Sequence, residues 1–507
     1  MATASQAPGV AALPVRHKAL LTLGLMLAMM MQILDTTIAN VAIPHMQASL
    51  GATIDTVSWV LTSYIVASAV AIPITGWLAD RIGSRLLLLA SVTGFIIASM
   101  LCGAAVNLEQ MVLFRVLQGI AAAFIGPLTQ AAMLDINPPA KQNMAMTVWS
   151  MGAVAGPIFG PIIGGWLTES YNWRWVFYVN LPIGLITFAL LFAFLPTHPA
   201  RRRRFDGFGF AMVAIGLASL QLMLDRGEQL DWFDSAEIWI MLGIAVAALW
   251  VFTVHMITAR DTIVSRSIFA NANFVAAFLL IALIGLVVFA VMALMPTMMQ
   301  GVFGYPVIDA GLLLAPRGVG VLIAMIIASR LITLVDQRAI LIIGFAIMAW
   351  SLHMMTGWSL DMDSRPIIVA SVIQGFGIGL TFVSLNVMAF ATLDPKLRAE
   401  GASLLNLGRS IGASVGISLG ASNLARSIQT SHADLSANIT PWTMPPMPAE
   451  TLGQYEPVGV AALAMVDAEI NRQATMIAYL NDFHLMMLAT LAAIPLLFLL
   501  RKPKEAA

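Results

Sequence analysis

Residues 152–165 read Gly152-Ala-Val-Ala-Gly156-Pro157-Ile-Phe-Gly160-Pro161-Ile-Ile-Gly164-Gly165, a stretch in which glycine recurs at every fourth position. The same ladder returns 256 residues later, at Gly408, Gly412, Gly416 and Gly420. The pair Gln118-Gly119 returns at the same offset as Gln374-Gly375. Matches at one constant offset indicate that the chain consists of two related halves.

The composition excludes an ordinary water-soluble fold. Of the 507 residues, 59% are hydrophobic and 10% are charged, and the mean hydropathy is +0.88. A soluble globular chain carries about 25% charged residues, so most of the outer surface must face lipid. The 26 Lys and Arg residues balance 26 Asp and Glu residues, which argues against a nucleic-acid partner. The single cysteine, Cys102, cannot form an internal disulfide.

Apolar stretches of about 20 residues, the length that crosses a bilayer, recur along the whole chain. The first follows a short polar segment without a cleavage site, so we interpret it as a span rather than a signal peptide. We predict fourteen spanning helices, at residues 18–42, 57–79, 86–106, 111–133, 144–167, 174–195, 207–224, 237–257, 273–299, 308–329, 339–357, 366–391, 400–420 and 483–500.

The predicted fold is therefore an all-α integral membrane protein of two six-helix halves with two inserted central helices. Its parts are an N-terminal segment at 1–17, a first bundle at 18–200, the inserted pair at 201–260 and a second bundle at 261–507, which contains a long outer loop at about 421–482. Duplicated halves are typical of secondary transporters, in which they rock about a site at the membrane midplane. A repeat that serves only packing is the alternative.

The distribution of positive charge predicts the orientation. Eighteen of the 26 Lys and Arg residues fall in loops on one side of the spans, five on the other side and three within spans. Cytoplasmic loops carry more Lys and Arg than outer loops. The side with eighteen is therefore the cytoplasmic side, and both termini are expected there. The run Arg201 to Arg204 fits a topology anchor, although a site for anionic lipid or a partner is the alternative.

Asp35 and Arg115 are charged residues that fall within spans, where charges are costly and usually functional. Asp35 is the only one of the 26 acidic residues well inside a predicted span. Removal from water favours the protonated form of a carboxylate, so Asp35 is our candidate for proton coupling. Arg115 lies several residues inside the fourth span. The alternatives are an Asp that positions the helix through its Thr and Asn neighbours, and an Arg that reaches the outer interface.

A tight connection between spans 2 and 3 forms a further motif. Residues 76–85 read Gly-Trp-Leu-Ala-Asp-Arg-Ile-Gly-Ser-Arg. Gly76 and Gly83 permit close approach, and Asp80 lies near a helix end where Arg81 and Arg85 can pair with it or with a neighbouring helix end. These features suit a conformational latch.

These motifs resemble those of the major facilitator superfamily. The loop 76–85 is similar to the superfamily pattern G-x-L-a-D-r-x-G-r-k, with Ser84 departing from the usual basic residue. The ladder 152–165 resembles the antiporter motif G-x-x-x-G-P-x-x-G-G, although a packing seam would explain any one glycine alone. Residues 34–44 resemble the L-D-x-T-I-V-N-V-A-L-P motif of fourteen-span drug/proton antiporters, and residues 220–233 resemble EmrB-type multidrug exporters.

The resemblance implies proton-coupled export of hydrophobic or amphipathic drugs across a bacterial inner membrane. It links Arg115 to proton transfer, and it implies a periplasmic membrane-fusion adaptor and an outer-membrane channel as partners. The loop at 421–482 contains five prolines between 441 and 457, and then a stretch at about 458–480 that we expect to be helical and to lead into the last span. The loop is a candidate docking surface for the adaptor, with a disordered connection as the alternative. Our substrate-binding candidates are the polar residues of the spans, Asn40, Gln118, Gln374 and Arg409. Asn40 also fits a structural role, and Arg317 and Arg409 fit either an anionic substrate or an interface.

Other classes of protein compete with this interpretation. A membrane-embedded enzyme would need a metal or nucleophile constellation, but there is no H-E-x-x-H motif and the seven His residues are scattered. We therefore expect no enzymatic activity, metal or cofactor. A proton-coupled uptake symporter and a scaffold or sensor remain alternatives, because fold alone does not fix function.

Overall fold

The computed structural model describes residues 13–197, 204–259, 261–332, 334–439 and 458–500. Across these residues the chain is helical, without a strand. Thirteen of the helical segments are long and apolar enough to cross a membrane. A further long helix, less apolar than the others, lies at the predicted thirteenth span. The predicted all-α multi-pass membrane fold is confirmed.

The N-half contains six spanning segments and the C-half contains six more. Those of the N-half are α1 (Lys18–Leu50), α3 to α4 (Trp59–Ala71, η1 Ile72–Ile74, Thr75–Ile82), α5 (Ser84–Ala104), α6 and α7 (Leu108–Ala123, Ile125–Asp135), α8 (Pro139–Ser170) and α10 (Asn180–Phe194). Those of the C-half are α14 (Ala272–Gly301), α15 and α16 (Val307–Leu314, Pro316–Leu331), α17 (Gln337–Thr356), α18 (Arg365–Ala391), α19 (Arg398–Ala437) and α21 (Val458–Ala493).

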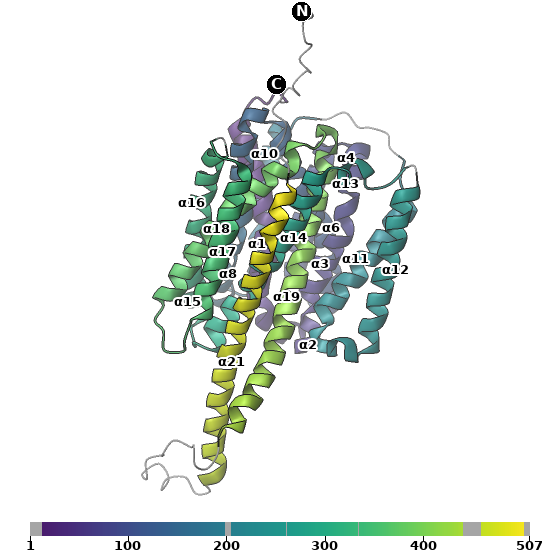
Figure 1. The fold of residues 1–507 in the computed structure, drawn as a ribbon. Helices are drawn as coiled ribbons and strands as arrows, with labels where there is room; N and C mark the ends of the chain where they lie inside the picture. Colours follow the sequence, from purple (N-terminus) through teal and green to yellow (C-terminus); the bar gives the residue numbers. More distant parts are fainter. Residues whose placement is uncertain (1–12, 198–203, 260, 333, 440–457, 501–507) are drawn as a thin grey trace, which may run out of the picture.

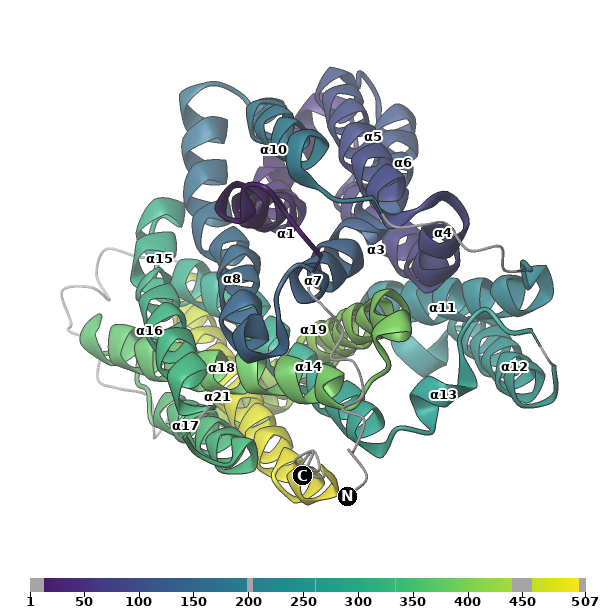
Figure 2. The same ribbon diagram turned by 90° about the horizontal axis from the view of Figure 1, so that it is seen from above.

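The remaining elements connect these spans. The inserted pair is α11 (Gly207–Arg226) and α12 (Ala236–Thr258), joined through η2 (Glu228–Leu230) and η3 (Trp232–Asp234). Short helices are α2 (Ile54–Val57), α9 (Trp175–Tyr178), α13 (Arg266–Phe269), η4 (Pro395–Leu397) and η5 (Pro495–Leu499). Figure 2 shows α11 and α12 packed together at one side of the bundle, beside α3 of the N-half.

The two halves repeat the same packing. The first helix of each half packs most extensively against the fifth, as α1 against α8 and α14 against α19. The second packs against the fourth, as α3 against α6 and α16 against α18. The glycine ladder lies in the first of these seams: a Cβ added to Gly160 would lie 2.1 Å from Oγ1 of Thr37, and one added to Gly412 would lie 1.9 Å from the carbonyl oxygen of Ala282. The glycines therefore allow close approach of the helices in both halves.

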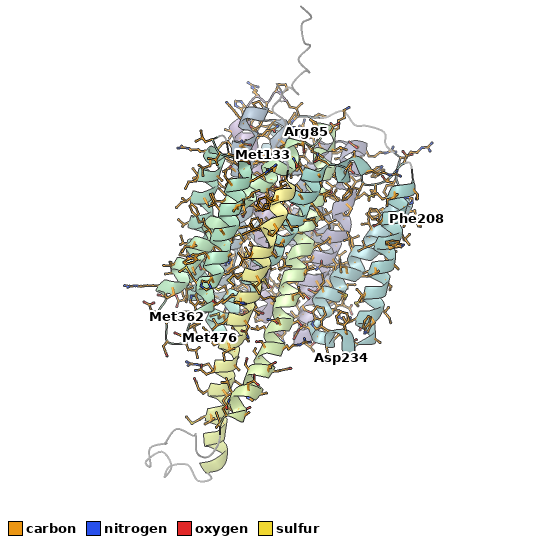
Figure 3. All side chains as sticks on the ribbon, viewed as in Figure 1. Arg85, Met133, Phe208, Asp234, Met362 and Met476 are labelled. Atoms are coloured by element: carbon orange, nitrogen blue, oxygen red, sulfur yellow. The ribbon has the colours of Figure 1, made fainter. Side chains whose placement is uncertain are left out.

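Fourteen crossings bring the chain back to the side on which it starts. We call this side, where α1 begins and α21 ends, the terminal face, and the opposite side the hairpin face (Figure 1). In Figure 3, Arg85 lies toward the terminal face and Asp234 at the hairpin face. The halves meet near the terminal face through α19 against α4, η1 and α7, and elsewhere through α8 against α15 and α16.

The segment after the predicted thirteenth span differs from the prediction. We expected a loop from 421, but α19 continues to Ala437. The helical stretch predicted at about 458–480 is confirmed, because α21 begins at Val458 and passes unbroken into the last span. The 40 residues of α19 extend about 60 Å, twice the roughly 30 Å of a hydrocarbon core, and form with α21 a hairpin that projects from the bundle (Figure 1). A helix outside lipid need not be apolar, so a search for apolar stretches finds only the part of a helix that lies in the membrane.

Several of our predictions concern residues outside the described part of the chain. They are the polar N-terminal residues 1–12, the basic residues Arg201 to Arg203, and the proline-containing stretch 440–457 at the end of the hairpin.

Candidate functional site

The two charges predicted inside spans form a buried ion pair. Asp35 on α1 and Arg115 on α6 meet with 2.7 Å between Oδ2 and Nη1, and both side chains are fully buried. The sequence distance is 80 residues, so their pairing depends on the packing of the N-half. Replacing only one member of a buried ion pair is strongly destabilising, because the remaining charge is left buried without a partner.

Two amides complete the hydrogen bonding of the Asp35 carboxylate. Gln118 on α6 and Asn180 on α10 each donate to Oδ1 at 2.8 Å. The Asn180 amide also donates to Ser99 Oγ at 3.0 Å, and Ser99 donates to the Phe177 carbonyl at 2.9 Å. The carboxylate therefore connects α1 with α6 and α10, and through Ser99 with α5.

Arg115 is fixed by its own set of contacts. Its Nε donates to the Val60 carbonyl of α3 at 2.9 Å, and its Nη1 also donates to Gln118 Oε1 at 2.7 Å. The guanidinium lies 4.3 Å from the ring centre of Tyr64, within cation–π range. A proton placed on Asp35 would thus remove the charge on which a network across five helices depends.

The sequence predicted part of this cluster. Asp35, Arg115 and Gln118 were all candidates, and the structure brings them together, with Gln118 on the carboxylate. Asn180 was missed, and its only signal was an amide at the start of an apolar span. Asn40, a substrate-binding candidate, lies on an exposed face of α1 and outside the cluster.

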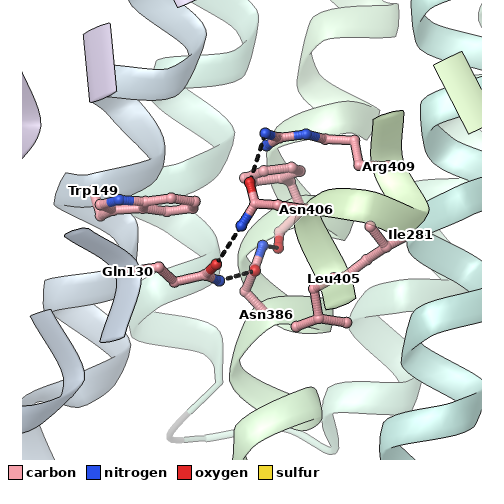
Figure 4. A pocket seen from close by; sticks show the side chains of 8 residues that line it. Gln130, Trp149, Ile281, Asn386, Leu405, Asn406 and Arg409 are labelled. Carbon is pink, nitrogen blue, oxygen red and sulfur yellow. Dashed lines mark hydrogen bonds between the residues drawn. The ribbon is translucent and has the colours of Figure 1, made fainter. Parts of the chain in front are cut away.

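A second polar network joins the two halves (Figure 4). Gln130 on α7 donates to Asn386 Oδ1 on α18 at 2.7 Å and accepts from Asn406 Nδ2 on α19 at 3.0 Å. Arg409, one turn further along α19, donates to Asn406 Oδ1 at 2.8 Å. Trp149 of α8 also lines this pocket and donates to Thr129 at 3.0 Å.

The pocket around this network is closed in the observed conformation. Its volume is about 10 Å³, room for roughly one water molecule, whereas sites for drug-sized ligands measure about 300–1,000 Å³. A substrate could therefore occupy this place only after the halves separate. Gln374, the remaining candidate, lies elsewhere, on α18 beside Arg317 of α16.

The 76–85 motif packs against the other half at the terminal face. A Cβ on Gly76 would lie 3.0 Å from Cβ of Glu400 on α19, and Gly83 adopts a φ of +89° where α4 ends. Arg85 donates to the Phe192 carbonyl at 2.7 Å, close to the end of α10, one of the two pairings we predicted for it. Arg81 is exposed.

Two further contacts lie at the terminal face. Glu400 of α19 accepts from the Ser265 backbone N–H and, at 3.0 Å, from its Oγ. Arg398 at the start of α19 pairs with Asp135 at the end of α7 at 2.9 Å. The Arg398–Asp135 pair crosses between the halves and holds the terminal face shut, whereas the Glu400–Ser265 contact lies within the C-half and fixes the start of α19.

A second acidic residue is buried at the edge of the last predicted span. Asp482 of α21 precedes that span by one residue, is fully buried and accepts from Asn423 of α19 at 2.6 Å. Among the described residues, no group of three or more His, Cys, Asp or Glu side chains is placed to hold a metal ion.

Comparison with known proteins agrees with this architecture. Residues 25–419 match the family model described as the Major Facilitator Superfamily. The chain belongs to that superfamily. It is 36% identical over 468 residues to the multidrug export protein EmrB of Escherichia coli K12, an alignment that covers 90% of each chain. It is 34% identical over 488 residues to the fatty acid resistance protein FarB of Neisseria gonorrhoeae, covering 95% of this chain and 96% of FarB.

A solved structure agrees at the level of the superfamily fold. The human organic anion transporter MFSD10 superimposes with a TM-score of 0.58 at 13% identity, covering 93% of this chain and 99% of that one. At this identity the likeness concerns the fold alone. The superfamily and the EmrB-type relatives predicted from the sequence motifs are confirmed, and membership of the superfamily indicates a transporter rather than an enzyme.

Proposed function

We propose that this protein is a proton-driven antiporter that exports hydrophobic or amphipathic toxic compounds. The observation that carries the proposal is the fully buried Asp35, bound by Arg115, Gln118 and Asn180 within one half. A transporter coupled to protons needs an acid whose charge state changes the packing of its helices. The names of the relatives EmrB and FarB support export of toxic compounds, including amphipathic ones.

In this mechanism, protonation acts through the hydrogen bonds of Asp35. The neutral acid no longer attracts Arg115, so the contact of α1 with α6 and α10 weakens and the N-half can change its shape. Release of the proton restores the pair. Rocking of the halves, which breaks the hydrogen bond between Gln130 and Asn386, then exposes the central site to either side of the membrane in turn.

Substrate binds, in this proposal, at the network between the halves. Arg409 and the amides of Gln130, Asn386 and Asn406 supply polar contacts there, and Trp149, Ile281 and Phe382 supply apolar ones. A lining that combines polar and apolar side chains suits amphipathic compounds, which have both kinds of group. Gln118 serves the Asp35 network rather than the substrate.

The same proposal covers location and assembly. Both termini lie in the cytoplasm of a bacterium, and the chain spans the inner membrane. The α19–α21 hairpin then extends into the periplasm, where it offers a helical docking surface to a membrane-fusion adaptor that leads to an outer-membrane channel. The charge asymmetry of the loops supports this orientation, and the length of the hairpin supports the docking role.

The decisive experiment measures drug resistance and proton-dependent efflux in a drug-sensitive host, with and without a cognate adaptor. Wild type is compared with Asp35→Asn at matched expression, and with Asp234→Asn, which makes the same change at an exposed site between α11 and α12. We expect efflux to be lost in Asp35→Asn and retained in Asp234→Asn. Undiminished efflux in Asp35→Asn would move proton coupling elsewhere. No efflux from wild type even with the adaptor would contradict the export proposal.

A further inference from the structure

The C-half contains an arginine–amide pair in which Arg317 is partly buried and Gln374 is fully buried, and which has no acidic partner among the described residues. Arg317 of α16 donates through Nη2 to Gln374 Oε1 of α18. Two other donors of this pair, Arg317 Nε and Gln374 Nε2, are buried and have no hydrogen-bond partner among the described residues. Ser371, one turn before Gln374 on α18, is fully buried with an unpartnered Oγ.

The internal repeat shows what such donors bind in the other half. Gln374 corresponds to Gln118 at the offset of 256, and Gln118 donates its Nε2 to the Asp35 carboxylate. In that half a guanidinium, that of Arg115, also donates to the carboxylate. The position that corresponds to Asp35 is Val291 of α14, which is fully buried and apolar, and the position that corresponds to Arg115 is Ser371. The C-half therefore keeps the amide donor and has replaced the acid, while its guanidinium comes from Arg317 on another helix, α16.

No other carboxylate takes that place. Among the described residues, no Asp or Glu lies within ion-pair distance of Arg317. An arginine inside a membrane-spanning segment is costly unless it is paired, and buried donors without acceptors add a further cost. A single anion that accepts from both Nε and Nε2 would remove both costs together.

We propose that the C-half binds an anion between α16 and α18, with Arg317 Nε and Gln374 Nε2 as its donors and Ser371 Oγ close by. Gln374 lies nine residues into α18, which begins at Arg365, so the site lies about 14 Å along the helix, near the middle of a hydrocarbon core of about 30 Å. The ligand class is a monovalent anion, either a small inorganic ion or the carboxylate of an amphipathic compound. Binding there does not depend on the direction or the proton coupling of transport.

The test uses the purified full-length protein and measures thermal unfolding at constant ionic strength. Potassium chloride is compared with potassium salts of a bulky sulfonate buffer, and laurate is compared with dodecanol, which has the same chain without the charge. We expect chloride, laurate or both to raise the unfolding midpoint in a saturable manner. A response to chloride identifies a small-anion site, and a response to laurate without one to chloride or dodecanol identifies a site for the head group of an amphipathic compound.

Variants connect the response to the proposed donors. Gln374→Glu gives Arg317 an internal carboxylate, so anion-dependent stabilisation should disappear while the anion-free protein becomes no less stable. Val291→Asp restores the acid at the position equivalent to Asp35 and should have the same effect, which provides a second variant if the first does not fold. Gln374→Met removes one donor and should weaken binding about tenfold.

The control is Arg365→Gln, which removes a positive charge from the exposed start of the same helix and should leave the response unchanged. The proposal is overturned if neither anion stabilises wild type. It is also overturned if Gln374→Glu and Val291→Asp respond to the anions as wild type does.

Discussion

Gln130 and Asn386 occupy the same position in the two halves, 256 residues apart, and hydrogen-bond to each other across the interface at 2.7 Å. Residues related by the repeat that contact each other lie close to the axis about which the halves are related. Gln130 also accepts from Asn406, so one side chain of the N-half holds two helices of the C-half. Any rocking that opens the central site must break these bonds.

Replacing Gln130 with Leu should therefore favour the conformation that is open at the terminal face. Interhelical hydrogen bonds in membrane proteins contribute about 0.6–1.7 kcal/mol each, so the loss of each of the two bonds of Gln130 should shift the equilibrium about 3- to 18-fold. The shift can be measured as the distance distribution between spin labels at Leu86 and Leu334, exposed residues near this face in different halves. Cys102 is buried and should not react with the label. An unchanged distribution would contradict a role for Gln130 in closure.

The ion pair between Asp135 and Arg398 should contribute to the same closure. Reversing one charge, as in Arg398→Asp, places two acids in contact and should open the terminal face about fivefold, equivalent to about 1 kcal/mol. The double variant Asp135→Arg with Arg398→Asp should close it again. The same pair of spin labels reports both effects. If the double variant is as open as the single one, the attraction between these charges is not what holds the face shut.

The Asp35–Arg115 pair predicts that a double variant recovers stability but does not recover transport. Asp35→Asn or Arg115→Gln alone leaves one buried charge without its partner and should destabilise the protein by about 3–5 kcal/mol. The double variant leaves no buried charge and should recover most of that stability, measured by thermal unfolding, while efflux stays absent. Recovery of efflux in the double variant would show that Asp35 is not the coupling acid.

The glycine ladder predicts that identical substitutions have unequal effects. A Cβ at Gly412 would lie 1.9 Å from the Ala282 carbonyl oxygen, so Gly412→Ala must push α14 and α19 apart. We expect a loss of about 1–3 kcal/mol in thermal unfolding. Gly243 of α12 has nothing within 4 Å of an added Cβ, so Gly243→Ala should leave stability unchanged. Equal losses in the two variants would mean that close packing of the ladder is not required.

The sequence predicted those features that can be recognised from the residue pattern alone. Asp35 and Arg115 were found because a charge interrupts an apolar run, and the repeat was found because its offset is constant. Their pairing could not be predicted, since it depends on how α1 packs against α6. Asn180 was missed because an uncharged amide costs little in an apolar span and does not stand out.

The extension of α19 to Ala437 was missed for another reason. Apolarity marks a helix only where lipid surrounds it, so the pattern did not show that α19 continues beyond the predicted span, although the helical stretch before the last span was predicted. The burial of Asp482 was missed as well, since it follows from how α21 packs against α19.

The length of α19 has a mechanical consequence. The same continuous helix touches α4, η1 and α7 of the N-half near the terminal face and forms one arm of the hairpin at its other end. For a rigid rod of about 60 Å, a tilt of about 10° at the first end moves the second by about 10 Å. The helix thus acts as a lever, because separation of the two halves at one end moves the hairpin at the other end. A protein bound to the hairpin would be displaced in each transport cycle.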